Sequence, residues 1–596
     1  MKRREFLAAT LALPALAQQT PHTFSWRGEQ FLLDGTPFLI RSGEMHYPRV
    51  PRPYWRDRMR KMRAMGLNTL CTYVFWNLHE PQQGKFDFSD NLDIAEYIRT
   101  AQSEGLYVLL RPGPYICTEW DFGGLPWWLL ATDMKVRSAD PRFLRAAALY
   151  IAQVGKQLAG LQIHRGGPIL MVQVENEYGS YGSDHEYMGA IRHMIQDAGF
   201  DCQLSTSDGS GKSNLTGGTL DGVLSVINFG DGSNPEREFA NFAAFRQNVP
   251  KMCGEFWYGW FDHWGEKHHV TSAAKGAAGV HWMLSNGISC NLYMAHGGST
   301  FGYMAGANGD KVYEPDISGY DYDAPIDEAG RPNAKFNAMR DVLRKHLAPG
   351  EQLPELPPAL PMISIPRFEL SESAPLLSRL PKPSHAGPPM SMEQLGQDYG
   401  FVLYRHHPAR AAKGSLEIGE VRDFAVVRGA TLDRRLHQNK LDVDLAPGQP
   451  LDILVEGMGR INFGAQLVSD RKGIAGKVTL NGEELKDWEH FSLPLTDPEK
   501  WTFARNPDTG PSLYRGTFRL AALGDTFLDM RGWGKGLVWI NGHNLGRYWR
   551  VGPQQSLFVP APWLKTGANE AIVLDLLDGK TRSLEARTDA IYETPA

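Results

Sequence analysis

Short apolar runs alternate with longer stretches of helical periodicity over roughly residues 31–347 of this chain. The apolar runs predict eight strands, at 38–46, 68–76, 107–112, 169–174, 203–207, 223–228, 252–256 and 288–294. The stretches between them predict helices at 54–65, 92–104, 141–158, 185–198, 235–247, 273–285 and 333–345. Repeated alternation of this kind implies parallel strands joined by right-handed crossovers. Eight such units in this length predict one (β/α)₈ TIM barrel.

The fourth predicted strand ends in an unusual way. Residues 169–174 form a continuous apolar run, which is typical of a strand buried on both faces, and Glu175, Asn176 and Glu177 follow it directly. In a (β/α)₈ barrel the carboxyl ends of the strands carry the chemistry. We therefore expect these side chains to lie at the mouth of the barrel.

Acids, amides and aromatic rings also follow the other predicted strands. Tyr73 ends the second strand, Glu119 follows the third, Glu255 lies in the seventh and Tyr293 in the eighth. Amides and acids suit the hydroxyls of a sugar, and rings suit its C–H faces. This mixture at one end of a barrel favours an uncharged, polyhydroxylated ligand.

The pattern changes after about residue 350. Residues 351–395 are rich in Pro, which lacks a backbone donor and favours extended chain, and we predict a linker there. The short strand-like runs beyond it predict an all-β sandwich or jelly-roll architecture, with two runs entering an Asn-Gly hairpin turn, at Asn481 and Asn541. The predicted organisation is a catalytic barrel at 24–350, a linker at 351–395, a first β-domain at 396–500 and a β-sandwich at 501–596.

The first residues predict export. Residues 1–17 combine a basic start, a short apolar run and a small-residue cleavage pattern, and Arg3-Arg4 resembles a twin-arginine signal. The apolar run is too short to anchor the chain in a bilayer, and we predict no membrane partner. The predicted location is the bacterial periplasm or the extracellular space.

Charge and the pattern of cysteines and histidines argue against a nucleic-acid-binding protein and against a metalloprotein. The 596 residues carry 62 Lys and Arg against 67 Asp and Glu, a net charge of -5, so a nucleic-acid partner is not expected. The five cysteines form no CxxC pair, and the histidines show no zinc-ligand spacing. We therefore predict no metal and no cofactor, and read the cysteines as small buried apolar residues.

Two of the strand-end carboxylates can cleave a glycosidic bond. Strands four and seven face each other across an eight-stranded mouth, so Glu177 and Glu255 can oppose one another. Cleavage with retention needs one protonated acid and one ionised nucleophile, about 5–5.5 Å apart. Asn176 fits a donor to the sugar 2-hydroxyl. Glu175 is the alternative acid, with a supporting role as its other interpretation.

Six long motifs resemble glycoside hydrolase family 35, the β-galactosidases. They occupy 111–117 (RPGPYIC), 123–129 (GGLPWWL), 173–179 (QVENEYG), 254–265 (GEFWYGWFDHWG), 320–330 (YDYDAPIDEAG) and 533–549 (WGKGLVWINGHNLGRYW). The resemblance implies a retaining, exo-acting β-galactosidase that acts on galactose-terminated carbohydrates, with Glu177 as acid/base and Glu255 as nucleophile. It places the galactose contacts on Tyr73, Cys117, Thr118, Glu119, Asn176, Trp260, Tyr293 and Tyr322.

Two residues depart from the family pattern, and two other functions stay open. Thr118 stands where Ala is expected, and His296 stands where an apolar residue is usual, which bears on aglycone and linkage preference. An exo-β-glucosaminidase of the same fold is the alternative enzyme; Glu119, placed to accept from the axial 4-hydroxyl of galactose, argues against it. A non-catalytic carbohydrate-binding exported protein is the other, although binding alone does not require two opposed glutamates. The oligomeric state and the galactosidic linkage are left open at this point.

Overall fold

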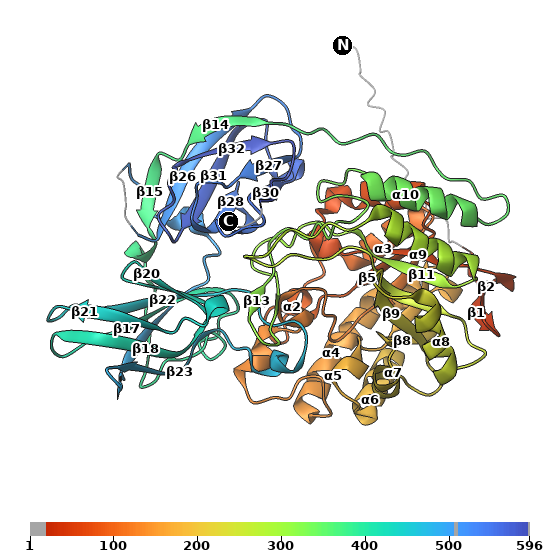
Figure 1. The fold of residues 1–596 in the computed structure, drawn as a ribbon, viewed down its shortest axis with the longest axis horizontal. Coiled ribbons are helices and arrows are strands. Elements are labelled where there is room, and N and C mark those ends of the chain that lie inside the picture. The colour runs from red at the N-terminus through yellow and green to blue at the C-terminus, as the bar shows by residue number, and fades with distance from the viewer. Residues whose placement is uncertain (1–19, 506–509, 594–596) are drawn as a thin grey trace, which may run out of the picture.

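A closed barrel of eight parallel strands forms the N-terminal half of the molecule (Figure 1). The computed structural model describes residues 20–505 and 510–593, so the predicted signal peptide at 1–17 lies outside the described residues. The barrel strands are β4 (Arg41–Met45), β5 (Thr69–Tyr73), β6 (Tyr107–Arg111), β7 (Ile169–Gln173), β8 (Gln203–Gly209), β9 (Leu224–Gly230), β10 (Met252–Trp257) and β11 (Ser289–His296). The residue range of each strand overlaps that of one of the eight predicted strands.

Helices surround the barrel and bury one apolar face each against it. The long ones are α1 (Trp55–Met65), α3 (Ile94–Ser103), α4 (Pro141–Leu158), α6 (His185–Asp197), α8 (Pro235–Phe245), α9 (Ala273–Ser285) and α10 (Ala334–Leu343). Shorter helices are α2 (Trp76–His79), α5 (Tyr178–Tyr181) and α7 (Lys212–Gly218). The sequence does not predict α7, because its polar, glycine-containing turns lack an apolar stripe. The predicted fold class is confirmed.

Small strands complete this half of the chain. A three-stranded sheet of β1 (Phe24–Arg27), β2 (Gln30–Leu33) and β3 (Thr36–Pro37) precedes the barrel, and residues 307–315 form a hairpin of β12 (Ala307–Asn308) and β13 (Glu314–Pro315). Cys71, Cys253 and Cys290 are buried, and all five cysteines are free thiols. In the parts of the chain that the structure describes, no helix has the length and apolar character needed to cross a membrane.

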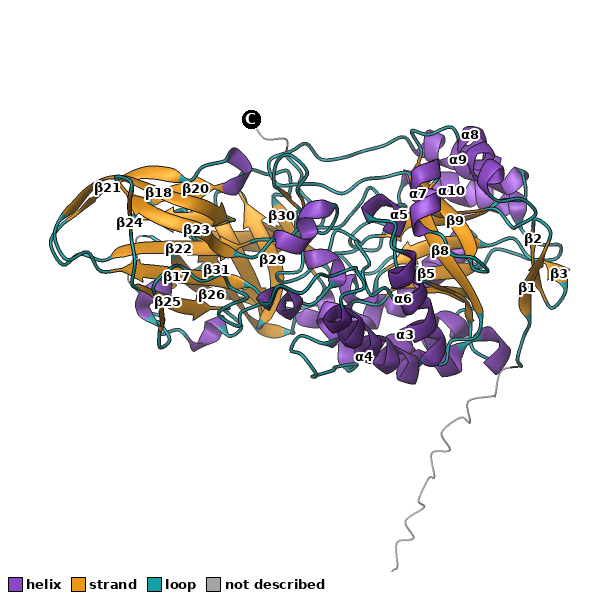
Figure 2. Ribbon diagram, turned by 90° about the horizontal axis from the view of Figure 1, so that it is seen from below, coloured by secondary structure: helices purple, strands orange, loops and turns teal. Residues whose placement is uncertain are grey.

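Four antiparallel sheets make up the C-terminal half, which lies beside the barrel in both views (Figure 2). Two belong to the first β-domain: β16-β25-β17-β22-β19-β20 and β21-β18-β23-β24. Their strands are β16 (Ser384–Ala386), β17 (Gly400–His406), β18 (Ala412–Arg422), β19 (Phe424–Val427), β20 (Ala430–Asp433), β21 (Lys440–Leu445), β22 (Leu451–Gly457), β23 (Gly473–Leu480), β24 (Glu483–Glu484) and β25 (Trp488–Leu493).

The second β-domain contains the sheets β14-β32-β27-β30 and β15-β26-β31-β28-β29. Their strands are β14 (Ile365–Glu369), β15 (Glu372–Pro375), β26 (Ser512–Leu520), β27 (Thr526–Asp529), β28 (Lys535–Ile540), β29 (His543–Trp549), β30 (Ser556–Val559), β31 (Gly567–Asp575) and β32 (Ser583–Arg587). Asn481-Gly482 and Asn541-Gly542 form the predicted tight hairpin turns, and all four residues have positive φ.

The Pro-rich segment is more than a tether. From the end of α10 it runs as an extended trace toward the second β-domain (Figure 1) and then supplies three strands. Strands β14 and β15 join the two sheets of the second β-domain, and β16 joins a sheet of the first. The segment therefore contributes strands to both β-domains, because its residues between the prolines still offer backbone groups to a neighbouring strand edge.

All three parts of the chain meet in one apolar cluster. From the barrel it contains Trp264, Tyr303, Tyr313 and Ile317; residues from both β-domains complete it. The barrel members are each at most 6% exposed. The β-domains therefore cover apolar surface that the barrel alone would leave in water.

Candidate active site

A cavity of about 310 Å³ opens at the carboxyl ends of the barrel strands. Every residue predicted for the site lines it: Tyr73, Cys117, Thr118, Glu119, Asn176, Glu177, Glu255, Trp260, Tyr293 and Tyr322. Six further residues complete the lining, Ile116, Trp257, Phe261, Asn308, Asp310 and Phe463. The structure thus gathers side chains from five barrel strands, β5, β6, β7, β10 and β11, or the loops after them, as the strand-end pattern predicted.

A bulge in β10 directs Glu255 into this cavity. Along β10, Cys253 pairs with Ile227 of β9 while Glu255 pairs with the next residue, Asn228, so Gly254 is the extra residue. A side chain at Gly254 would have no room, because a Cβ there would lie 2.6 Å from Ser207 Oγ and 2.9 Å from Asn228 Oδ1. The glycine of the Gly-Glu-Phe motif is therefore needed for packing as well as for the bulge.

Three donors hold the Glu255 carboxylate. Arg111 Nη2 and Tyr73 Oη donate to Oε1 at 2.5 and 2.7 Å, and Trp257 Nε1 donates to Oε2 at 3.0 Å. Arg111 in turn stacks on the Tyr73 ring, with its guanidinium carbon 4.0 Å from the ring centre. The carboxylate is fixed in one orientation, with a charge-assisted hydrogen bond among its contacts.

Glu177 has fewer partners. Asn228 Nδ2 donates to Glu177 Oε1 at 2.9 Å, and Ser207 Oγ donates to Asn228 Oδ1 at 2.7 Å, which turns the amide of Asn228 toward the glutamate. Burial, together with the charge of Glu255, raises the pKa of Glu177 to about 7. Its carboxyl group can therefore carry a proton near neutral pH.

Glu175, the alternative acid, is not among the residues that line the cavity, whereas Glu177 is. Arg137 donates two hydrogen bonds of 2.8 Å to its carboxylate, and Tyr187 donates a third at 2.9 Å. Glu175 and Glu177 both have positive φ, 58° and 47°, so the chain turns sharply between them. Every oxygen of Glu175 is occupied, and a supporting role is the one that its contacts favour.

Asn176 lies between the two cavity glutamates with a fixed amide. Its Oδ1 accepts from Tyr73 at 3.0 Å, from Arg111 at 2.9 Å and from Gln173 at 3.0 Å. The NH₂ group donates one hydrogen bond to the Ile116 carbonyl at 3.5 Å, and its second N–H can donate to a ligand oxygen in the cavity.

The loop after β6 is held in a left-handed conformation. Cys117, Thr118 and Glu119 have φ of 60°, 54° and 49°, a strained arrangement for residues with side chains. Arg49 Nη2 stabilises it by donating to the Thr118 carbonyl at 2.6 Å, and Tyr320 donates to the Glu119 carboxyl group. Burial raises the pKa of Glu119 to about 7.

Aromatic rings form the remaining walls. Tyr293 and Tyr322 meet edge to face with ring centres 5.4 Å apart, and Trp260 stacks on Phe261 at 5.0 Å. Trp260 is 38% exposed, although most large apolar side chains of the barrel are buried. It therefore offers a ring to a ligand at the entrance.

Thr118 and His296, the two residues that depart from the family pattern, differ in their position relative to the cavity. Thr118 lines the cavity, and its buried hydroxyl has no hydrogen-bond partner among the described residues. His296 is outside the lining; its Nδ1 bonds to the Ile326 carbonyl at 3.2 Å, and burial lowers its pKa to about 3. An uncharged, buried histidine replaces an apolar residue here without reaching the cavity.

Several residues of the site were not predicted from sequence. Arg111 begins the 111–117 motif but was assigned no role there, and Ser207 and Asn228 lie in strands that gave no signal beyond their β pattern. Phe463 comes from the first β-domain, about 200 residues after Glu255, and is 42% exposed beside the cavity. Within residues 20–505 and 510–593, no three His, Cys, Asp or Glu side chains are grouped as metal ligands.

Three family models match the chain. One described as "Glycosyl hydrolases family 35" matches residues 30–346, "Beta-galactosidase, first all-beta domain" matches 389–494, and "Beta-galactosidase, galactose-binding domain" matches 511–569. A "Beta-galactosidase" of Xanthomonas manihotis is 47% identical over 93% of this chain and 94% of its own length. "Beta-galactosidase-1-like protein 2" and "Beta-galactosidase" of Homo sapiens are 40% and 38% identical, over 92% and 94% of this chain and 89% and 88% of their own lengths.

Proposed function

The chain belongs to glycosyl hydrolase family 35, and from this membership we propose that it is an exo-acting β-galactosidase that cleaves with retention of configuration. The substrate is a carbohydrate with a terminal β-D-galactose. Glu177 is the acid/base and Glu255 the nucleophile. The observation that carries the proposal is that two carboxyl groups in one cavity are held differently. Three donors contact Glu255, whereas burial raises the pKa of Glu177 to about 7.

In the first step, the Glu177 proton passes to the glycosidic oxygen while a Glu255 oxygen bonds to the anomeric carbon. The bond between that carbon and the glycosidic oxygen breaks, and the aglycone leaves with the proton. A galactosyl ester on Glu255 remains. The Arg111 and Tyr73 donors hold the attacking carboxylate in place, and the raised pKa of Glu177 supports its proton-donating role.

In the second step, Glu177 acts as a base. It takes a proton from water, the water oxygen bonds to the anomeric carbon, and the ester bond to Glu255 breaks. Two inversions at the same carbon return β-galactose. Glu177 regains its proton, so the cycle closes without another group.

The Glu119 loop supports galactose as the sugar. Glu119 lines the cavity beside Tyr320, and in the proposed complex it accepts from the axial 4-hydroxyl while an N–H of Asn176 donates to the 2-hydroxyl. The exo-β-glucosaminidase alternative would favour an acid at the 2-position, where the proposed complex has the Asn176 amide. Exo action is supported by the cavity volume of about 310 Å³, at the small end of ligand sites.

The stereochemical course tests the proposal directly. Hydrolysis of nitrophenyl β-galactoside followed by proton NMR should show β-galactose first and α-galactose later, by mutarotation. A 2-fluoro galactosyl inhibitor should label Glu255, and Glu255→Gln should abolish turnover while the protein keeps its thermal unfolding midpoint. Early α-galactose, label on another residue, or a preference for glucosaminides would refute it.

A further inference from the structure

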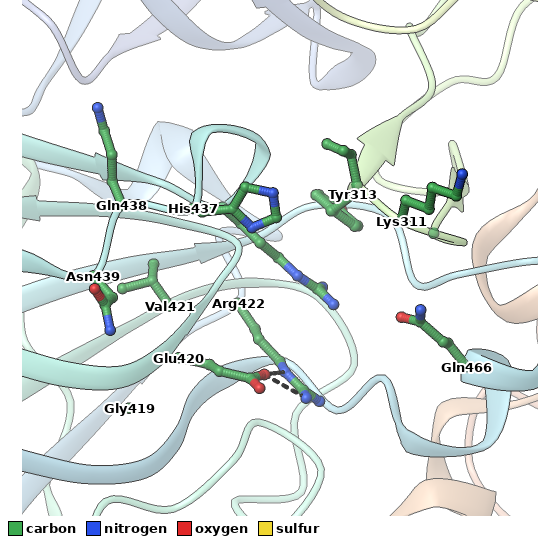
Figure 3. Close-up of a pocket in the computed structure, with 13 residues that line it drawn as sticks. Lys311, Tyr313, Gly419, Glu420, Val421, Arg422, His437, Gln438, Asn439 and Gln466 are labelled. Carbon is green, nitrogen blue, oxygen red and sulfur yellow. Dashed lines mark hydrogen bonds and ion pairs between the residues drawn. The ribbon is translucent and has the colours of Figure 1, made fainter.

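A second cavity lies where the β12–β13 hairpin meets the first β-domain (Figure 3). Its volume is about 370 Å³. The lining comes from the hairpin, including Lys311 and Tyr313, from β18, including Glu420 and Arg422, from the residues after β20, including Arg434 and Asn439, and from Gln466. No lining residue is shared with the catalytic cavity.

The two cavities are nevertheless neighbours. Asp310 lines the catalytic cavity and Lys311, the next residue, lines the second one. Consecutive Cα atoms are about 3.8 Å apart, so the hairpin is a narrow ridge between the cavities. The β-domain loop repeats the arrangement, with Phe463 in the first lining and Gln466 in the second, and Gln466 Nε2 donates to the Asp310 carbonyl at 2.9 Å. The two linings therefore adjoin along this ridge, and a chain of sugars extending over it from the catalytic cavity would enter the second one.

Arg434 places a fixed guanidinium in the lining of the second cavity, and together with Lys472 it balances the charge of two buried carboxylates. Its Nη1 donates to Asp423 and Asp470, both at 2.7 Å, and its guanidinium stacks on the Tyr313 ring at 4.2 Å. Its Nε and Nη2 have no partner among the described residues, and the side chain is 18% exposed. An immobilised guanidinium with an open edge suits an acidic group, because little side-chain entropy is lost on binding.

The walls add further donors. Lys311 is exposed and has no ion-pair partner within the described residues, and Figure 3 shows it on the hairpin side, across from Gln438 and Asn439. Glu420 is the one acid of the lining, and Arg422 pairs with it. The charge of Lys311 is therefore uncompensated at the rim, and the cavity favours a negatively charged ligand.

We propose that this cavity binds a carboxylate or sulfate group carried by an oligosaccharide whose terminal galactose occupies the catalytic cavity. The proposal rests on the proposed function for the position of the galactose. Binding of the acidic group in the second cavity makes the enzyme selective for acidic glycans through residues that do not touch the reacting bond.

Three galactose-terminated trisaccharides that differ only in the sugar farthest from the galactose test this inference. One ends in a uronic acid, one carries a sulfate ester on that sugar, and one is neutral. Titration calorimetry on Glu255→Gln, which cannot turn them over, should show roughly fivefold tighter binding of at least one acidic probe at low salt. The preference should fall as salt rises. Comparison of the uronate and sulfate trisaccharides identifies which of the two acidic groups the cavity binds more tightly.

Variants of the second cavity then locate the preference. In the Glu255→Gln background, Lys311→Glu should remove it and Asn439→Ala, which deletes a neutral donor of the lining, should only reduce it, whereas Lys440→Ala, at an exposed lysine outside the lining, should keep it. In otherwise native enzyme, all three should hydrolyse nitrophenyl β-galactoside at the native rate. No acid preference in the native cavity, or a preference that survives Lys311→Glu, would overturn the inference. Native enzyme that does not cleave nitrophenyl β-galactoside would instead refute the proposed function.

Discussion

The two glutamates of the catalytic cavity differ in how they are held. Glu255 accepts hydrogen bonds from an arginine, a tyrosine and a tryptophan, whereas Glu177 accepts one from an asparagine and lies in the field of Glu255. These different surroundings are what suit the two glutamates to the two roles that we propose for them. Predictions at the scale of single residues concern Glu177 and the amide that holds it.

Glu177→Ala should slow hydrolysis in proportion to the basicity of the leaving group. An acid assists poor leaving groups most, so natural oligosaccharides should lose roughly 10²–10⁴-fold and activated aryl galactosides less. Azide should restore turnover of activated substrates and yield β-galactosyl azide, which mass spectrometry and NMR identify. Equal loss for all leaving groups without azide rescue would transfer the role to Glu175.

Asn228→Ala should change the pH dependence as well as the rate. The native alkaline limb of kcat/KM should lie near pH 7, because Glu177 must be protonated and its pKa is about 7. The Asn228 hydrogen bond favours the ionised form, so its loss should raise the pKa of Glu177 and move the limb to higher pH. We expect kcat to fall by up to about 100-fold.

Ser207→Ala is the matched control for this prediction. It leaves Asn228 in place but frees its amide to rotate, so the limb should move in the same direction by less. An alkaline limb that is unchanged in Asn228→Ala would show that Asn228 packs beside Glu177 without setting its protonation.

At the scale of elements, one loop of the first β-domain supports the barrel loop that follows β6 and contains Glu119. Arg460, between β22 and β23, donates to Asp121 from its backbone N–H at 2.6 Å and from Nη1 at 2.9 Å. Asp121 follows Glu119 by two residues. A β-domain element thus helps to maintain the strained backbone of a barrel loop.

Asp121→Asn should therefore weaken both folding and substrate binding. Replacing a buried carboxylate that accepts from a charged group should lower the free energy of unfolding by about 1.5–3 kcal/mol, measured in urea. KM for nitrophenyl β-galactoside should rise more than kcat falls, because the Glu119 loop loosens. Asp398→Asn removes another carboxylate from Arg460 but not from this loop, and its KM should stay native. Equal KM changes in both variants would contradict the bracing role.

At the scale of the whole molecule, the β-domains are structural partners of the barrel. Trp264, Tyr303, Tyr313 and Ile317 of the barrel pack with residues of both β-domains, and Phe463 reaches the catalytic cavity from the first. Neither role is compatible with a detachable module.

Cutting the chain after Lys345 should give aggregated or inactive protein. The truncated barrel would expose the apolar cluster to water and lose the wall that Phe463 supplies. Size-exclusion chromatography with light scattering and activity on nitrophenyl β-galactoside measure the two effects. A soluble, monomeric and fully active barrel would show that the β-domains are accessory.

The sequence by itself determined the eight barrel strands, seven of the helices, both Asn-Gly turns and the ten cavity residues named from strand ends and family motifs. These features depend on local periodicity, turn chemistry and contiguous motifs, all of which the order of residues records. It did not determine the strands of the Pro-rich segment, whose partners lie far along the chain.

Only the tertiary structure decided the rest. It turned Glu175 toward Arg137 and Glu177 toward Asn228, brought Phe463 to the barrel mouth, and placed Lys311 and Arg434 around one cavity. Contacts between residues far apart in the chain depend on how whole elements pack, and no local pattern of apolar and polar residues contains that information.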